Sequence, residues 1–215
     1  MPVRQIPLSR RSHVTGAQPL AAGMDMIGHE SALERDFVLL QRLDPAVLAI
    51  EEQPVKISWA ASDGRVRYYT PDYRVVRQDG TELVEVKYRQ DLRANWSQYR
   101  DRLIAARDWA RLHGMSFRIA TERGIRTARL LNAKRLVPRM RDPIDHLLQQ
   151  DCIELLDRGG PLTFRQVVEA LTAQGRPEGD VLAALWPMIA RRFVTCDLDV
   201  PISGGTLLFV QCRNF

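Results

Sequence analysis

The dipeptide Asp79-Gly80 constrains the fold of this chain most, because it stands between two stretches with the composition of β-strands. A type I′ turn needs positive φ at both central positions, and Asn, Asp and Gly tolerate that conformation. Strands over residues 66–76 and 82–88 are therefore predicted to form an antiparallel hairpin. With Asp79 and Gly80 as the loop, Gln78 pairs with Thr81, and this pairing sets the register of the ladder.

This register places Asp72 opposite Lys87 and Arg74 opposite Glu85. Because side chains alternate between the two faces of a strand, Asp72, Glu85 and Lys87 are predicted to project from one face. The other face is apolar and suits packing on a core; its residues are Tyr73, Val75, Val84 and Val86. A slip of one residue would separate the charged groups, so the prediction depends on the turn.

Two carboxylates and one ammonium group on one face suit a divalent cation. Mg²⁺ prefers near-octahedral oxygen ligation from one or two carboxylates, water and phosphate oxygens, and Asp72 with Glu85 can supply the protein ligands. Lys87 then orients or polarises the attacking water and offsets charge on the phosphate. The alternative is a surface hairpin whose charges pair across strands. The apolar residues on either side of Glu85 favour the site.

Length, charge and composition limit the number of domains, the type of partner and the location that we expect for this chain. A chain of 215 residues can bury a real core and corresponds to one domain or a large domain with a small companion. Its net charge of +5 favours an anionic partner. The three cysteines and four histidines show no zinc or disulfide spacing. The sequence contains no membrane-length apolar run and no signal-peptide core, so we expect a soluble, cytoplasmic protein.

The residues before the hairpin fall into two parts. Residues 1–29 are rich in Arg, Pro, Gly and Ser, which indicates an extended basic arm that either contacts a phosphate backbone or is simply an unstructured tail. A helix over 31–43 begins with the capping box Ser31-x-x-Glu34. Glu34 therefore has two candidate roles, capping the helix or completing a metal site, and helical spacing alone favours the cap.

The residues after the hairpin indicate a mixed α/β sheet. An antiparallel meander is predicted from a strand at 50–59 and the hairpin. A crossover follows it, consisting of a long helix over 92–112 that leads to a strand over 115–121. The helix buries Leu92, Trp96, Leu103, Ala106 and Ala110 in this prediction. Its other side is basic and bears Arg93, Arg100, Arg102, Arg107 and Arg111. Such a side is either a solvated face or a phosphate footprint, and its place beside the proposed site favours the footprint, with Arg93, Arg100 and Arg107 as candidate contacts.

A domain boundary is expected at 137–143, where two prolines and a change of charge occur. This divides the chain into an arm (1–29), a first domain (30–137) and a C-terminal domain (142–215). Three helices followed by a hairpin predict a small winged-helix-like fold for the C-terminal domain. Its third helix, 181–192, is too apolar to read DNA convincingly, so protein docking or core packing is the alternative.

Several segments together resemble TnsA, the endonuclease subunit of heteromeric bacterial transposases, within the PD-(D/E)xK nucleases. The segments that carry the resemblance are Ser12-His13-Val14-Thr15-Gly16, the run from Glu30 to Asp36, Glu52-Gln53-Pro54-Val55, Tyr69-Thr70-Pro71-Asp72-Tyr73, Val84-Glu85-Val86-Lys87 and the run from Thr121 to Arg126. They occur in the expected order over residues 4–136. The resemblance implies a restriction-endonuclease-like mixed sheet flanked by helices.

It also implies that Glu34, Asp72 and Glu85 are acidic metal-site residues and that Lys87 is the catalytic lysine, which moves Glu34 from cap to site. Some relatives carry Gln where this chain has Glu85, and Glu keeps an anionic ligand there. The implied cofactor is Mg²⁺, with Mn²⁺ able to substitute.

The implied function is cleavage of the 5′ strand at transposon ends during cut-and-paste transposition. The implied partners are double-stranded DNA, a transposase subunit that cuts the 3′ strand, and an AAA+ ATPase regulator that docks through the C-terminal domain. Two alternatives stay open: a stand-alone restriction or repair nuclease of the same fold, and a catalytically inactive module that binds DNA or protein.

Overall fold

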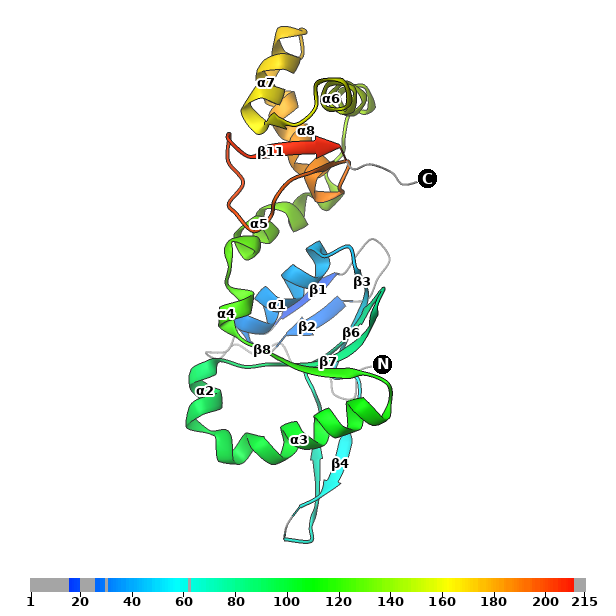
Figure 1. Cartoon of the computed structure of the whole chain (residues 1–215), viewed down its shortest axis with the longest axis vertical. Coiled ribbons are helices and arrows are strands. Elements are labelled where there is room, and N and C mark those ends of the chain that lie inside the picture. Colours follow the sequence, from blue (N-terminus) through cyan, green and yellow to red (C-terminus); the bar gives the residue numbers. More distant parts are fainter. Residues whose placement is uncertain (1–15, 20–25, 30, 62, 211–215) are drawn as a thin grey trace. The chain divides into compact units, whose positions relative to one another are not determined.

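The computed structural model describes residues 16–19, 26–29, 31–61 and 63–210 (Figure 1). Contacts divide the chain into two compact units, Met1–Arg126 and Thr127–Phe215. The sequence placed the boundary later, at 137–143, and the limits of the functional domains stay a prediction. Within the described residues, no helix combines the length and the apolar character needed to cross a membrane.

The first unit is built on a mixed four-stranded sheet in the order β3-β6-β7-β8. Its strands are β3 (Val47–Glu52), β6 (Tyr73–Arg77), β7 (Gly80–Val86) and β8 (Ser116–Ala120). The first three are antiparallel, whereas β7 and β8 run parallel. A parallel pair needs a long crossover, which here consists of α2 (Arg89–Ala94) and α3 (Trp96–Leu112). The predicted mixed sheet with helices is confirmed.

Helices cover both faces of this sheet (Figure 1). On one face, Leu33 and Phe37 of α1 (Ala32–Leu43) pack in a core with the apolar strand residues predicted from the hairpin, Tyr73, Val75, Val84 and Val86. On the other face, Leu83 packs with Ala106 and Ala110 of α3. The alternation of β7 thus sends its side chains into two separate cores, and Glu85 lies on the same face as Leu83.

The hairpin has a different register from the predicted one. Arg77 pairs with Gly80, so the loop residues are Gln78 and Asp79 rather than Asp79 and Gly80. Gly80 is the first residue of β7 and has φ +154°, a conformation that L side chains rarely adopt. The backbone N–H of Gln78 donates to the carbonyl of Ala46 at 3.0 Å, which holds the loop against the end of β3.

The observed ladder pairs Tyr73 with Val84, so its continuation sets Asp72 opposite Glu85 rather than Lys87. The predicted pairs of Asp72 with Lys87 and of Arg74 with Glu85 are therefore wrong by two residues. Because the error is an even number, every side chain keeps its predicted face.

Two long predicted elements are interrupted. Strand 50–59 is divided between β3 and β4 (Ile57–Ala60), with Gln53 at φ +46° at the break. β4 pairs with β5 (Val66–Tyr69) in a separate two-stranded ribbon. Helix 92–112 breaks at Asn95, and Trp96 is 51% exposed rather than inward as predicted.

The N-terminal arm lies mostly outside the described residues. Where it is described, β1 (Gly16–Pro19) and β2 (Met26–His29) pair as an antiparallel ladder. Ser12-His13-Val14, part of the resembling segments, lies outside the described residues.

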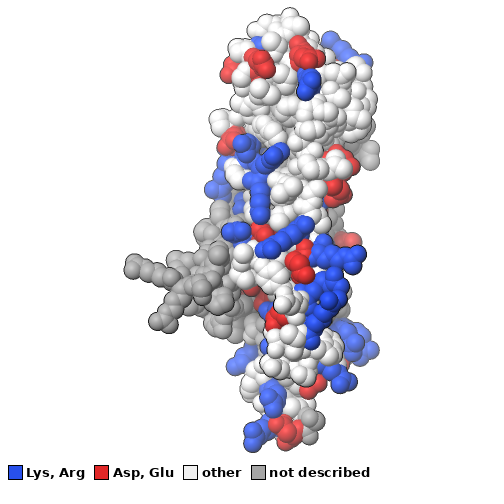
Figure 2. Space-filling view, turned by 90° about the vertical axis from the view of Figure 1, so that its left-hand side faces the viewer, with Lys and Arg blue, Asp and Glu red and all other residues white. Residues whose placement is uncertain are grey.

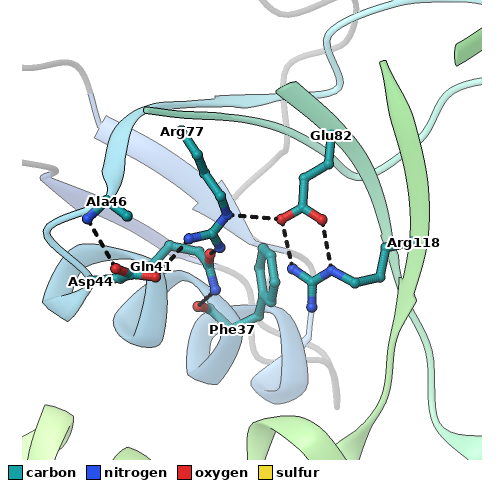
Figure 3. A network of polar contacts seen from close by, with 7 residues as sticks. All are labelled: Phe37, Gln41, Asp44, Ala46, Arg77, Glu82 and Arg118. Atoms are coloured by element: carbon teal, nitrogen blue, oxygen red, sulfur yellow. Dashed lines mark hydrogen bonds and ion pairs between the residues drawn. The ribbon is translucent and has the colours of Figure 1, made fainter. Parts of the chain in front are cut away.

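A polar network links α1 to the ends of the sheet strands (Figure 3). Arg77 donates to Asp44 at 2.6 Å and to Glu82 at 3.1 Å, and it also contacts Gln41. Arg118 of β8 donates to both oxygens of Glu82, at 2.8 and 3.0 Å. Burial opposes ionisation of Glu82, but the two arginines outweigh it and lower the pKa of this carboxyl group. The network ties three strands and one helix together.

The second unit contains helices and a small antiparallel sheet in the order β10-β11-β9. Its helices are α5 (Ala128–Leu136), the 3₁₀ helix η1 (Val137–Arg141), α6 (His146–Gly159), α7 (Phe164–Ala173) and α8 (Glu178–Ala190). Its strands are β9 (Leu162–Thr163), β10 (Val194–Thr195) and β11 (Leu207–Val210). Helix α8 buries Leu185 and Met188 almost completely, which agrees with core packing rather than groove reading.

Candidate active site

A cleft of about 400 Å³ opens beside the β5-β6-β7 segment of the first unit. Three of the four predicted site residues line it: Asp72, Glu85 and Lys87. The other lining residues are Gln53, Lys56, Tyr68, Tyr69, Thr70 and Arg102. The charged hairpin residues therefore do converge, and they face a cavity.

Asp72 lies just before β6, where Pro71 precedes it in the chain. Its Oδ2 accepts a hydrogen bond from the backbone N–H of Val86 at 2.7 Å, and its carbonyl accepts one from Gln53 at 2.8 Å. These bonds hold the carboxylate against the end of β7. Burial and the charge of Glu85 raise the pKa of Asp72 well above its usual range, although Lys87 opposes the shift.

Glu85 is the most deeply buried of the cleft's charged groups, with a relative exposure of 2%. The hydroxyl of Tyr69 donates to its Oε2. Burial, and then the charge of Glu85, raise the pKa of Tyr69, so this phenol stays a donor at neutral pH. Tyr69 thus fixes the orientation of the Glu85 carboxylate.

Lys87 follows β7 directly, and its backbone N–H donates to the carbonyl of Ala120 at 3.0 Å. Its Nζ lies 3.2 Å from Glu85 Oε1 and 3.9 Å from Asp72 Oδ2. Burial disfavours the ammonium ion, but Asp72 and Glu85 outweigh this effect and raise the pKa of Lys87. Lys87 is therefore a cation held between two carboxylates.

Glu34 combines features of both roles considered from the sequence. Its backbone N–H donates to Ser31 Oγ at 3.1 Å, and Ser31 Oγ donates to its Oε1 at 3.0 Å, so it belongs to the cap of α1. It does not line the cleft. Nevertheless it is 8% exposed, and the charges of Lys87 and Glu85 both act on it. Burial is the main cause of the raised pKa of Glu34.

Asp72 and Glu85 are two carboxylates near each other in the cleft, with the Lys87 ammonium group between them. No group of three or more His, Cys, Asp or Glu side chains within the described ranges is arranged to hold a metal ion, so the fit rests on the pair Asp72 and Glu85. A pair of carboxylates is the usual protein share of a Mg²⁺ shell. Their oxygens are hard donors, so the residues present fit this ion.

The predicted DNA contacts lie away from the cleft lining. Arg93, Arg100 and Arg107 are exposed on α2 and α3. In Figure 2, Lys and Arg side chains are prominent on the side of the molecule that carries α2 and α4 (Glu122–Ile125), with acidic side chains interspersed among them. Arg123 and Arg126 are also exposed there. The first unit thus presents basic side chains outside the cleft that holds Asp72 and Glu85.

Sequence reasoning assigned no role to Tyr69, Lys56 or Arg102. Tyr69 stood beside Asp72 in the resembling segment and could have been suspected as a partner of the acidic residues. Arg102 was counted among the outward arginines of a helix. Its spacing of three from Tyr99 placed the two side chains on one helix face, which was the available signal that it differs from its neighbours.

Comparison with known proteins identifies a match within the first unit. Residues 44–122 match the family described as "TnsA-like endonuclease N terminal". The matched region contains Asp72, Glu85 and Lys87, and it begins after Glu34. No curated protein matches the chain.

Proposed function

Because residues 44–122 form a TnsA-like endonuclease N-terminal domain, we propose that this chain is the DNA endonuclease subunit of a transposase. In this proposal it cleaves the 5′ strand at transposon ends, while a separate transposase subunit cuts and joins the 3′ strand. The first unit is a restriction-endonuclease-like domain, and the second is a winged-helix-like domain.

The observation that carries the proposal is the convergence of Asp72, Glu85 and Lys87 in one cleft of the matched region. These residues supply the groups that hydrolysis of a phosphodiester needs: anionic oxygens for a divalent cation, and a cation for charge that develops on the phosphate. Asp72 precedes the first strand of the hairpin, whereas Glu85 and Lys87 lie at the end of its second strand. The pairing of the two strands therefore assembles the site.

The residues have distinct roles in this proposal. Asp72 and Glu85 hold Mg²⁺, and Mn²⁺ can substitute; when bound, the ion lowers the pKa of water and neutralises phosphate charge. Lys87 orients the attacking water and offsets charge on the non-bridging oxygens. Tyr69 keeps Glu85 in place through its hydroxyl. Glu34, next to this cluster on α1, adds a third carboxylate to the metal surroundings.

The proposed partners follow from the same assignment. Duplex DNA contacts the exposed arginines of α2 and α3, and the second unit docks the AAA+ ATPase that regulates transposition. Because cutting has to be coordinated with the other strand, we expect the isolated chain to cleave weakly until the transposase subunit presents the DNA.

Asp72→Asn tests the catalytic assignment in a complete transposition reaction with Mg²⁺, scored for nicks on each strand. We expect 5′-strand nicks to fall to the background while 3′-strand nicks persist. Asp101→Asn is the matched control, since Asp101 is exposed on α3 and the substitution makes the same chemical change. Persistent 5′ nicking by Asp72→Asn would show that another chain performs the reaction. Strong cleavage of arbitrary duplex by the isolated wild-type chain would instead indicate a stand-alone nuclease.

A further inference from the structure

Two cations, Arg102 and Lys56, line the same cleft as the acidic pair. Arg102 comes from α3, and Lys56 immediately precedes β4. Neither was part of the site expected from the sequence. With Lys87, they give the cleft three cations beside its two carboxylates.

The guanidinium of Arg102 is held by aromatic rings. Its Cζ lies 4.2 Å from the ring centroid of Tyr99 and 5.5 Å from that of Tyr69. Its Nε is buried and has no hydrogen-bond partner among the described residues. A buried N–H without a partner is unusual in a folded protein and calls for an explanation such as a ligand.

The rings that hold Arg102 are themselves fixed. The hydroxyl of Tyr99 donates to Asp91 at 2.7 Å, and Asn95 Nδ2 donates to the same carboxylate at 2.6 Å. The hydroxyl of Tyr69 donates to Glu85. Tyr69 therefore lies against Arg102 with its ring and bonds Glu85 with its hydroxyl, which fixes Arg102 relative to this carboxylate.

Lys56 repeats this arrangement on the β4-β5 ribbon. Its Nζ lies 4.4 Å from the ring centroid of Tyr68, which is 61% exposed. Stacking on an aromatic ring restrains an ammonium or guanidinium group without neutralising its charge. Both cations are thus positioned in advance and keep the ability to bind an anion.

We propose that Arg102 and Lys56 form a phosphate clamp that binds the DNA backbone beside the phosphodiester cleaved at Asp72 and Glu85. The planar guanidinium donates to phosphate oxygens in a fork, and the ammonium binds as a point charge. The proposal rests on the proposed nuclease function and adds the residues that hold the strand in the cleft. The buried Nε of Arg102 gains its partner when the phosphate binds.

The test is the Arg102 Nε–Hε resonance in nuclear magnetic resonance spectra of the full chain with ¹⁵N-labelled arginine. The resonance is assigned by its loss in Arg102→Gln. A short duplex of arbitrary sequence is titrated in the presence of EDTA, and we expect this resonance to shift. Absence of binding, or binding that leaves the resonance unmoved, would overturn the clamp.

Affinity gives a second readout. Removal of a charge-assisted hydrogen bond to phosphate should weaken duplex binding by roughly ten- to a hundredfold for Arg102→Gln. The slope of log affinity against log salt should also fall by about 0.9 for each phosphate that the variant no longer neutralises. Arg102→Lys keeps the charge but not the fork, so its slope stays near that of the wild type while its affinity is lower. Arg102→Gln with wild-type affinity and slope would contradict the proposal.

Arg158→Gln is the charge-matched control, because the Arg158 side chain is 80% exposed in the second unit and pairs with Glu154. Thermal unfolding of each variant confirms that it is folded before binding is compared. The EDTA assay involves no cleavage. Failure of the catalytic assignment would appear in the Asp72→Asn reaction, and failure of the clamp would appear only in binding.

Discussion

The ion pair between Lys87 and Glu85 allows a quantitative prediction about the metal-free protein. Lys87→Met removes the ammonium group but keeps most of the aliphatic side chain, and Glu85→Gln removes the negative charge with almost no change of shape. In the folded chain the two groups lie 3.2 Å apart, with side-chain exposures of 24% and 3%. The two single variants and the double variant form a double-mutant cycle.

The expected magnitude follows from this distance. At an effective dielectric constant of about 20, unit charges 3.2 Å apart attract by about 5 kcal/mol. Desolvation of both ions offsets part of this attraction, and removal of one partner from a buried pair costs about 3–5 kcal/mol. Lys87 is partly exposed, so we expect about 3 kcal/mol for Lys87→Met. For a chain of this size that corresponds to a loss of roughly 6–12 °C in Tm.

Glu85→Gln should cost less, because Lys87 keeps Asp72 as a neighbour at 3.9 Å and has access to water. In the double variant no uncompensated charge is left at either position. The sum of the two single losses in unfolding free energy should therefore exceed the loss in the double variant by about 2 kcal/mol. The pKa of Lys87 is raised in the folded chain, so the ion pair contributes its full stabilisation at any pH below the pKa of an unperturbed lysine, about 10. We therefore expect this contribution to be constant around neutral pH.

Urea unfolding at neutral pH in EDTA measures these free energies. Trp59, Trp96 and Trp109 lie in the first unit, so tryptophan fluorescence in a Trp186→Phe background reports the unfolding of that unit. The exposed pair Arg67 and Asp63, 2.9 Å apart, provides a control cycle in which the two single effects are expected to add, because solvent screens the charges. Additivity of the Lys87 and Glu85 effects to within about 0.5 kcal/mol would refute the ion pair.

Two further predictions concern the polar network and the basic surface. The lowered pKa of Glu82 means that its ionised form stabilises the fold above its unfolded pKa of about 4.3. Glu82→Gln should therefore cost about 2 kcal/mol at neutral pH, because it weakens charge-assisted hydrogen bonds from Arg77 and Arg118. The difference from wild type in urea unfolding should shrink as the pH falls below that value, and a constant difference would contradict this account. The variant in which Gln replaces Arg93, Arg100 and Arg107 together should bind duplex DNA more weakly and with a flatter salt dependence. An unchanged salt slope would reject the proposed footprint.

The part of the site that lies on the hairpin could be predicted from local patterns. Alternation along a strand is a property of the backbone, so the common face of Asp72, Glu85 and Lys87 and the apolar face of Tyr73 and Val84 followed from residue spacing. The exact pairing did not follow. It depends on contacts of the loop with Ala46 and of Arg77 with Asp44, which are distant in the sequence.

The positions of side chains from other elements were decided by tertiary packing. On α3, Arg100, Arg102 and Arg107 are the same residue type on one helix, yet Arg102 alone among these three lines the cleft, because Tyr69 and Tyr99 bring it there. Glu34 shows the same limit: its spacing from Ser31 accounts for the cap, whereas its closeness to Lys87 depends on how α1 packs on the sheet. Local spacing determines the face on which a side chain lies, and only the packing of separate elements determines what it meets there.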